Sequence, residues 1–337
     1  MLDVNSSTYV ADGATARRNI EQRSCSRWHK KDSGPDDSDR QLASQRLREP
    51  LFIPALEPGF RLQRDDKFFA IGSCFARGIE KALLGRKMEV LSVAPEFASL
   101  QTINESVTGL GFTNKYNTFS IYNELHWALD PEAKFPRETI VELGDGNVVD
   151  PHINPTLPVA GAEETWRRRS LIQMVNRRAA ECRVVIVTLG LIEAWRDTKA
   201  DTFLNSTPFF DLLRLYPDRY EFHVTSFGQN LANLEGIHTL LARFGHHDVQ
   251  IVVTVSPVPL MATFSGEDVV LANSYSKSLL RTVAQQWAAM HQNVHYFPSY
   301  EIVMNSDRAR TWEPDLRHVK PEVTLHIMRL FLQAYLS

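Results

Sequence analysis

Five short apolar runs, each followed by small or turn-forming residues, constrain the fold of this chain more than any other feature. RVVIVTL (183–189) and VQIVVTVS (249–256) are apolar at most positions and do not alternate with polar residues. Such runs are typical of strands buried on both faces, which occur in parallel sheets covered by helices on both sides. The runs KFFAI (67–71), MEVLSV (88–93) and NVHYF (293–297) are shorter and similar in character.

Segments with apolar residues at helical spacing separate these runs. They cover 75–86, 117–129, 164–182, 229–244 and 274–290, and Pro321 opens a last one. We therefore predict an α/β protein of three layers (α/β/α), with a flavodoxin-like, doubly wound and mostly parallel sheet of about five strands. Ligands of such sheets bind beyond the carboxyl ends of the strands, so residues that follow the strands are candidates for a functional site.

The first 50 residues differ in composition from the rest of the chain. They are rich in charges of both signs and poor in aliphatic residues. Such a segment buries too little apolar surface to offset the entropy of ordering it. We expect residues 1–50 to be a disordered or loosely draped tail, and residues 51–337 to form the α/β domain.

Charge and composition exclude several classes of function. The formal charge of −3 gives no reason to expect a nucleic-acid partner. The apolar runs are shorter than the roughly 20 residues of a membrane span, and the N-terminus lacks the apolar core of a secretory signal. Three cysteines without a CxxC pair indicate a cytoplasmic protein without structural zinc. His246 and His247 lack partners at ligand spacing, and no glycine-rich phosphate loop is present, so we predict neither a metal nor a cofactor.

The turn Gly72-Ser73-Cys74 joins the first apolar run to the first helix. A thiol at a helix N-terminus experiences the positive end of the helix dipole, which lowers its pKa. Backbone N–H groups there also bind anions, so the turn can supply a nucleophile and part of an oxyanion hole. The alternative is a buried cysteine that only begins a helix.

A second pair of polar residues, Asp315 and His318, precedes the last helix. A carboxylate three residues before a histidine can orient its imidazole over a nucleophile from another strand. The alternative is that Asp315 stabilises its own turn and His318 is solvated.

The chain resembles the GSCFA family, which is named for the motif that stands here at residues 72–76. Further segments similar to that family are KYNTFSIYNELHWAL, TLGLIEAWRD, TVSPVPLMATF, ANSYSKSLLR, YFPSYEIV and PDLRHV. The family is grouped with the SGNH/GDSL hydrolases, so the resemblance implies a three-layer α/β/α fold and an esterase or acyltransferase type of site.

The resemblance also implies roles for particular residues. The superfamily's first block, Gly-Asp-Ser, falls on Gly72-Ser73-Cys74 with Cys74 as the nucleophile. A shift by one residue makes Ser73 the nucleophile but misplaces the glycine. The superfamily's D-x-x-H block falls on Asp315 and His318.

The third block is degraded: Gly190 is present, its usual Asn is missing, and Glu193 replaces the Asp. Asn117 is a candidate substitute for the missing oxyanion donor, with a helix N-cap as the alternative. Tyr300 and Glu301 follow the last strand and are candidates for substrate contact.

Two groups of basic residues are interpreted as solvated. Lys277 could bind an anionic substrate group, but an exposed helix lysine is the favoured interpretation. Arg167, Arg168 and Arg169 are interpreted as an exposed helix face.

These observations lead to two hypotheses. The first is an acyl-ester enzyme acting on a small-molecule or glycan substrate, such as a surface-glycan precursor. In it Cys74 or Ser73 attacks the acyl carbonyl, His318 takes the proton, Asp315 orients His318, and helix N–H groups with Gly190 stabilise the oxyanion. The alternative is a non-catalytic module that binds a glycan or a protein partner.

Overall fold

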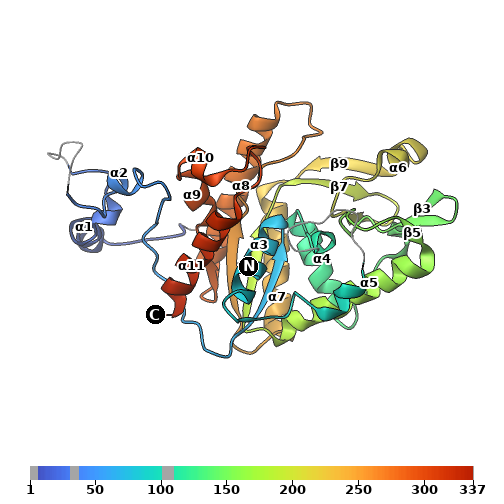
Figure 1. Cartoon of the computed structure of the whole chain (residues 1–337), viewed down its shortest axis with the longest axis horizontal. Helices are drawn as coiled ribbons and strands as arrows, with labels where there is room; N and C mark the ends of the chain where they lie inside the picture. The colour runs from blue at the N-terminus through green and yellow to red at the C-terminus, as the bar shows by residue number, and fades with distance from the viewer. Residues whose placement is uncertain (1–6, 31–37, 101–109, 337) are drawn as a thin grey trace.

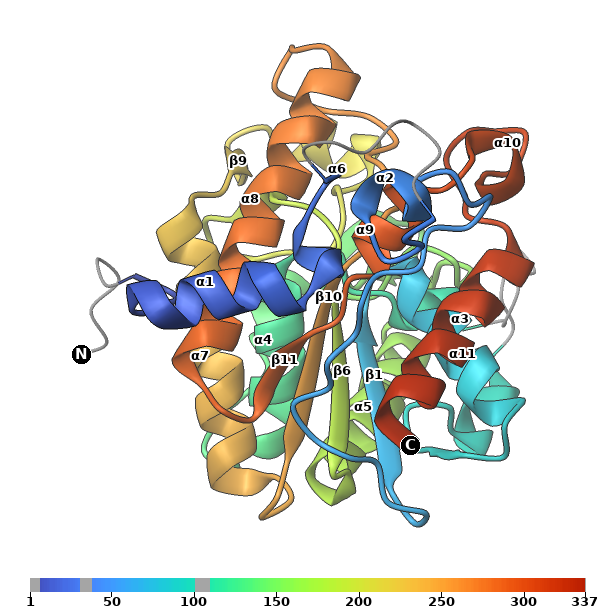
Figure 2. The same cartoon turned by 90° about the vertical axis from the view of Figure 1, so that its left-hand side faces the viewer.

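The computed structural model of the chain describes residues 7–30, 38–100 and 110–336. Figure 1 shows the whole chain. Its centre is a five-stranded parallel sheet in the order β11-β10-β6-β1-β2, of which Figure 2 labels β11, β10, β6 and β1. The strands are β1 (Lys67–Gly72), β2 (Glu89–Val90), β6 (Val184–Leu189), β10 (Gln250–Val255) and β11 (Val294–Tyr296). Each of the five apolar runs forms one strand, so the predicted α/β class and parallel sheet are confirmed. In chain order the sheet is 2-1-3-4-5, the flavodoxin-like arrangement, and its direction of winding reverses between β1 and β6.

Successive residues of a strand pack alternately into two hydrophobic cores, one on each face of the sheet, because their side chains point to opposite faces. In β1, Phe69 and Ile71 contact one core, while Phe68 and Ala70 contact the other. The first core is closed by α4 (Thr118–Leu129), α7 (Phe227–Phe244) and α8 (Val269–Met290), and the second by α3 (Cys74–Leu84) and α11 (Pro321–Leu336). Figure 2 shows the sheet between these two helical layers, which confirms the three-layer fold.

The remaining helices are shorter or lie outside these two layers. They are α1 (Gly13–Gln22), α2 (Ala43–Arg46), α5 (Ala162–Arg177), α6 (Phe210–Leu215), α9 (Ser299–Met304) and α10 (Arg308–Thr311), with short 3-10 turns at 24–26, 95–99, 111–113, 137–139 and 178–181. Among the described residues, no helix is both long enough and apolar enough to cross a membrane.

Two small antiparallel sheets were not expected from the sequence. One joins β3 (Val141–Gly144), β4 (Asn147–Val149) and β5 (Ala160–Gly161), and the other joins β7 (Glu193–Asp197), β8 (Thr202–Phe203) and β9 (Tyr220–Val224). The β3–β4 hairpin turns at Asp145 and Gly146, which both have positive φ angles. An Asp-Gly pair is a strong hairpin signal, so this first sheet was detectable in the sequence.

The described part of the first 50 residues contains some local structure. Helices α1 and α2 form there, and Arg46 Nη2 donates a hydrogen bond to the carbonyl of Cys25. The segment reaches the α/β domain at Pro50, whose carbonyl accepts from the N–H of Asp307. Residues 1–6 and 31–37 of the predicted tail lie outside the described residues, and the boundary at residue 50 stays a prediction.

Gly72 ends β1 in a conformation that needs glycine. Its φ is +133°, and a Cβ atom there would lie 2.1 Å from the carbonyl oxygen of Thr188 on the neighbouring strand β6. The chain can therefore leave the sheet toward α3 only because this position has no side chain.

Replacing Gly72 by alanine is expected to lower the free energy of unfolding by about 3 kcal/mol or more, because backbone strain and a clash add. Gly144→Ala is the matched control, since Gly144 also has a positive φ (+106°) but no atoms within 4 Å of the added Cβ. Urea unfolding of both variants measures the difference. Equal losses would show that the approach to Thr188 imposes no constraint.

Candidate functional site

The turn after β1 places Ser73 and Cys74 at the carboxyl edge of the sheet. Ser73 is the N-cap residue of α3 and only 3% exposed, and its N–H donates to the carbonyl of Thr188 at 3.2 Å. Its hydroxyl lies 3.4 Å from the hydroxyl of Thr188. Cys74 is the first residue of α3 and is half-buried. The more accessible of the two candidate nucleophiles is therefore Cys74.

Burial raises the pKa of the Cys74 thiol. The positive charges of Arg317 and Lys277 and the backbone N–H groups of Cys74 and Phe75 act in the opposite direction. Because burial is the largest effect, the resting side chain is a neutral thiol near pH 7 and needs a proton acceptor before it can attack.

A second chain segment crosses the same edge just before α4. The N–H of Lys115 donates to the carbonyl of Gly72 at 2.7 Å, and the carbonyl of Tyr116 accepts from Leu191 at 2.9 Å. A Cβ atom on Gly190 would lie 2.5 Å from the Tyr116 carbonyl oxygen and 3.3 Å from the Cβ of Ser73. Gly190 is therefore packed against the turn at residues 72–74, as its position after β6 predicts.

Lys277 lies at this edge, and the favoured interpretation of it as an exposed lysine is wrong. Its side chain, on α8, is 1% exposed, and its Nζ donates to the carbonyl of Gly190 at 2.6 Å. Burial lowers the pKa of Lys277 to about 7; the nearby Cys74 raises it and the charge of Arg317 lowers it further. The sequence held a signal for this burial, because Lys277 falls three residues before Leu280 and seven before Ala284, on the apolar stripe of the helix.

Asp315 and His318 form a pair in the loop before α11. Asp315 Oδ2 lies 2.5 Å from His318 Nδ1, and Asp315 Oδ1 accepts from the backbone N–H groups of Arg317 and His318, each at 3.0 Å. These backbone bonds, followed by the imidazole, hold the pKa of Asp315 well below its usual value. The turn interpretation of Asp315 and the orienting interpretation therefore both apply, although the His318 side chain is 51% exposed.

His318 Nε2 lies 3.1 Å from Arg317 Nη1. Since a guanidinium only donates, Nε2 is the acceptor and Nδ1 carries the proton toward Asp315. This tautomer is the one that a general base needs. Arg317 links the two parts of the site, because its charge also acts on Cys74. In the described part of the chain no direct hydrogen bond joins His318 to Cys74.

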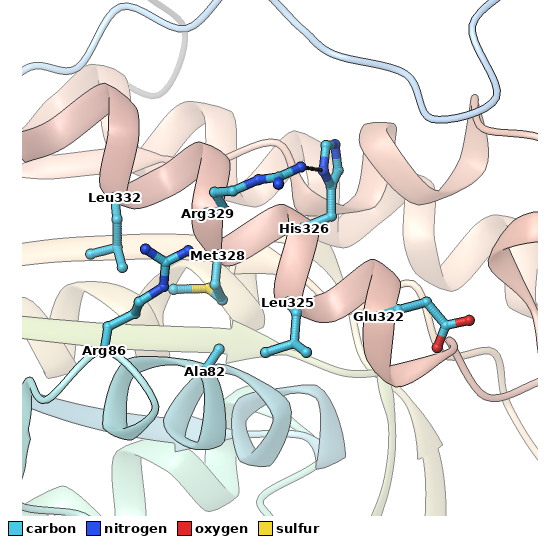
Figure 3. Close-up of a pocket in the computed structure, with 8 residues that line it drawn as sticks. All are labelled: Ala82, Arg86, Glu322, Leu325, His326, Met328, Arg329 and Leu332. Carbon is cyan, nitrogen blue, oxygen red and sulfur yellow. Dashed lines mark hydrogen bonds between the residues drawn. The ribbon is translucent and has the colours of Figure 1, made fainter.

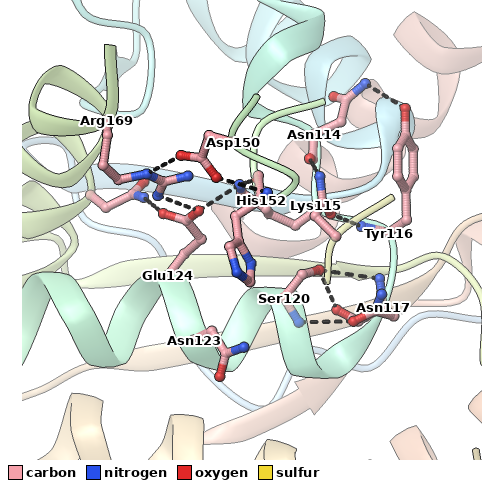
Figure 4. A network of polar contacts seen from close by, with 12 residues as sticks. Asn114, Lys115, Tyr116, Asn117, Ser120, Asn123, Glu124, Asp150, His152 and Arg169 are labelled. Atoms are coloured by element: carbon pink, nitrogen blue, oxygen red, sulfur yellow. Dashed lines mark hydrogen bonds and ion pairs between the residues drawn. The ribbon is translucent and has the colours of Figure 1, made fainter. Parts of the chain in front are cut away.

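Asn117 caps the N-terminus of α4. Its Oδ1 accepts from the N–H of Ser120 at 2.8 Å, which Figure 4 shows, and its Nδ2 donates to the carbonyl of Leu204 at 2.9 Å. The oxygen and one N–H of the amide are engaged at the start of the helix, so the helix N-cap interpretation is confirmed.

The other candidates for substrate contact are held in separate clusters. Glu193 begins β7 and accepts from the hydroxyl of Thr263 at 2.5 Å, and burial raises the pKa of its carboxyl. Glu301 accepts from Arg281 at 2.6 Å and from the hydroxyl of Tyr296 at 2.7 Å.

Tyr296 ends β11, which β10 and β6 separate from β1, so Glu301 and its neighbour Tyr300 lie toward the far side of the sheet from Cys74. Glu301 lines a cavity of about 540 Å³ that the N-terminal segment 52–58 helps to form. Tyr300 and Glu301 are therefore not part of the same site as Cys74, whereas the substrate role expected of Glu193 stays a prediction.

A buried cluster of charges supports the segment that crosses the edge (Figure 4). Lys115 Nζ donates to Glu124 at 2.7 Å and to the carbonyl of His152 at 2.5 Å. Arg169 donates to Glu124 and to Asp150, each at 2.7 Å. Arg169 is 1% exposed, so the interpretation of Arg167–Arg169 as a solvated face is wrong for its last member.

The His152 side chain lies beside this charged cluster and has no polar partner among the described residues. Its ring contacts Trp127 and Phe135 edge-on, and neither ring nitrogen has a hydrogen-bond partner among the described residues. Burial lowers the pKa of His152 from 6.5 to about 4, and the neighbouring charges modify it less.

A surface groove between α3 and α11 is distinct from this site (Figure 3). Its lining includes Ala82 and Arg86, at the end of α3 opposite to Cys74. Eight residues of helix separate Cys74 from Ala82, which corresponds to about 12 Å. The groove therefore opens near the far end of α3 from Cys74.

The low pKa of His152 predicts a pH dependence of stability. Between pH 6.5 and about 4 the unfolded chain protonates this histidine and the folded chain does not, so the free energy of unfolding falls as the pH falls, by up to about 3 kcal/mol. His152→Phe is expected to remove this part of the slope, because the phenyl ring suits the aromatic surroundings. Denaturant unfolding at several pH values measures it.

The control is His247→Gln, at an exposed loop position. It should keep the wild-type slope. A His152→Phe variant with the full wild-type slope would show that His152 is not kept neutral in the folded protein.

Comparison with known proteins adds one finding. The GSCFA family model matches residues 67–331, which cover the central sheet, the turn at residues 72–74 and the Asp315–His318 pair. Among curated proteins no sequence matches the chain.

Proposed function

The chain belongs to the GSCFA family, and from this premise we propose that it is an acyl-ester enzyme, an esterase or an O-acyltransferase of the SGNH type. One observation carries the proposal. His318 is held by Asp315 with Nε2 free of a proton, and its partner Arg317 acts on the thiol that begins α3. A nucleophile after the first strand and an Asp–His pair before the last helix form the set of groups that acyl transfer requires.

The proposed reaction has two steps. The Cys74 sulfur attacks the acyl carbonyl carbon while its proton passes to His318 Nε2, and the oxyanion that forms is stabilised by the N–H groups of Cys74 and Phe75. Collapse releases the alcohol, which takes the proton from His318, and leaves a thioester. A water molecule or an acceptor hydroxyl then gives its proton to His318 and attacks the thioester, which regenerates the thiol.

The accessibility of the two neighbouring side chains supports Cys74 as the nucleophile over Ser73. Ser73 is 3% exposed and its hydroxyl faces Thr188, whereas Cys74 is half-buried and its sulfur faces the N–H groups of the helix start. We further propose a carbohydrate or surface-glycan precursor as the acyl acceptor or donor, and a cytoplasmic location. The free state of Cys25, Cys74 and Cys182 supports a reducing compartment.

A non-catalytic binding module is the second candidate. It is favoured by the hydrogen bonds that already engage the amide of Asn117 and the carboxyl of Glu193, the residues that the resemblance offers in place of the usual Asn and Asp of the third block. Such a module would bind a glycan or a protein partner at the same edge without turnover.

Brief exposure to p-nitrophenyl acetate tests the enzyme directly. Intact-protein mass spectrometry should detect one acetyl adduct that Cys74→Ala abolishes. His318→Ala should slow its formation by about 100-fold or more, since it removes the general base. Neutral hydroxylamine should release the acetyl group rapidly, because the linkage is a thioester.

Ser73→Ala is the matched control and should still form the adduct. Loss in Ser73→Ala alone, with an adduct resistant to neutral hydroxylamine, would keep the reaction class but make Ser73 the nucleophile. No adduct in the wild-type protein, together with unchanged glycan binding by Cys74→Ala, would contradict the enzyme and support the binding module.

A further inference from the structure

Two cationic side chains approach Cys74 from different elements. Lys277 comes from α8 and donates to the carbonyl of Gly190, which packs against Ser73. Arg317 comes from the loop before α11 and donates to His318 Nε2. The charges of both act on the thiol of Cys74.

Neither cation is neutralised by a carboxylate in the contacts of the described residues. The acceptor of Lys277 is a carbonyl and that of Arg317 is a neutral imidazole, while the nearby carboxylate of Asp315 is taken by His318 and by backbone N–H groups. Arg317 Nε is buried and has no hydrogen-bond partner among the described residues.

Three other buried or half-buried guanidinium groups of this protein are paired with acids. Arg169 binds Glu124 and Asp150, Arg183 binds Asp66 and Asp248, and Arg219 binds Asp197. Unlike these three groups, Arg317 has an imidazole and no carboxylate as its side-chain acceptor in the contacts of the described residues.

Burying a cation without a counter-ion is unfavourable. Lys277 can relieve this cost by losing its proton, but a guanidinium stays charged. The thiolate of Cys74 would be a counter-ion, yet burial keeps the thiol protonated near neutral pH. The resting site is thus electropositive and contains an unused N–H donor, which a bound anion would satisfy.

We propose that Arg317 and Lys277 form an anion subsite beside Cys74. This inference rests on the proposed function, and it implies that the acyl compound carries a carboxylate or a phosphate near its reacting carbonyl group. The planar fork of Arg317 suits the oxygens of either group, and Lys277 adds a point charge at the inner end of the site.

Alkylation of Cys74 tests the subsite without any acyl transfer. Iodoacetate is anionic and iodoacetamide is neutral, and both react with the thiolate of Cys74. The rate with iodoacetate divided by the rate with iodoacetamide therefore reports the local charge and not the fraction of the thiol that is ionised. Peptide mapping gives the rates at Cys74, with glutathione as the reference thiol. The ratio is expected to exceed that of glutathione by about tenfold, the effect of a nearby charge that solvent screens only in part.

Arg317→Gln and Lys277→Met should each bring the ratio toward that of glutathione. Arg281→Gln is the matched control, since it removes a cation one turn further along α8 that Glu301 already neutralises, and it should leave the ratio unchanged. Arg317 lies in a loop, so its variant tests the subsite even where Lys277→Met fails to fold. A wild-type ratio equal to that of glutathione, unchanged in Arg317→Gln, would overturn the proposal.

Competition identifies the anion. Inorganic phosphate and acetate are added separately while iodoacetamide reacts with Cys74. Protection by phosphate that is lost in Arg317→Gln supports a phosphate-bearing compound, and protection by acetate that is lost in the same variant supports a carboxylate-bearing one. Protection by neither ion contradicts the subsite. An enzyme without the subsite would form the acetyl adduct, but its iodoacetate-to-iodoacetamide rate ratio would equal that of glutathione. A binding module with the subsite would have a raised rate ratio and would form no acetyl adduct.

Discussion

The hydrogen bond from the N–H of Lys115 to the carbonyl of Gly72 is the contact on which the rest of the site depends. It joins the segment before α4 to the turn that presents Cys74. The side chain of the same lysine is fixed by Glu124 in a buried cluster that also holds Arg169 and Asp150. Removing one partner of a buried ion pair typically costs about 3–5 kcal/mol, so this segment has little freedom to move. The turn after β1 is thereby held between Thr188 on one side and Lys115 on the other.

The chemistry proposed for the site follows from two opposing effects at Cys74. Burial favours the neutral thiol, whereas the helix N–H groups and the charges of Arg317 and Lys277 favour the thiolate. The thiolate becomes favourable when a proton acceptor is available, and His318 has the tautomer for that role. An anionic compound that satisfied Arg317 would also bring its carbonyl group to the sulfur, so binding energy away from the reacting bond would promote the reaction.

The sheet was predictable because its strands are buried on both faces and therefore appear as uninterrupted apolar runs. The number of strands and the position of the turn at Gly72 followed from that pattern, and the strand order is that of the flavodoxin-like arrangement predicted for five such strands. The roles of the charged residues were harder to predict, because a charged residue on a helix is usually exposed. Arg169 is buried since Glu124 and Asp150, each from a distant part of the chain, neutralise it. No local pattern reveals such partners, although Lys277 lay on an apolar stripe that marked it as buried.

The measurement that tests this account most directly is a crystal structure of the protein with Cys74 carboxymethylated by iodoacetate. The added carboxylate is a short anion attached to the proposed nucleophile. The account predicts that it accepts hydrogen bonds from Arg317 Nε and Lys277 Nζ, with Asp315 still bound to His318. A carboxylate that points into solvent, with Arg317 still donating only to His318, would contradict the account.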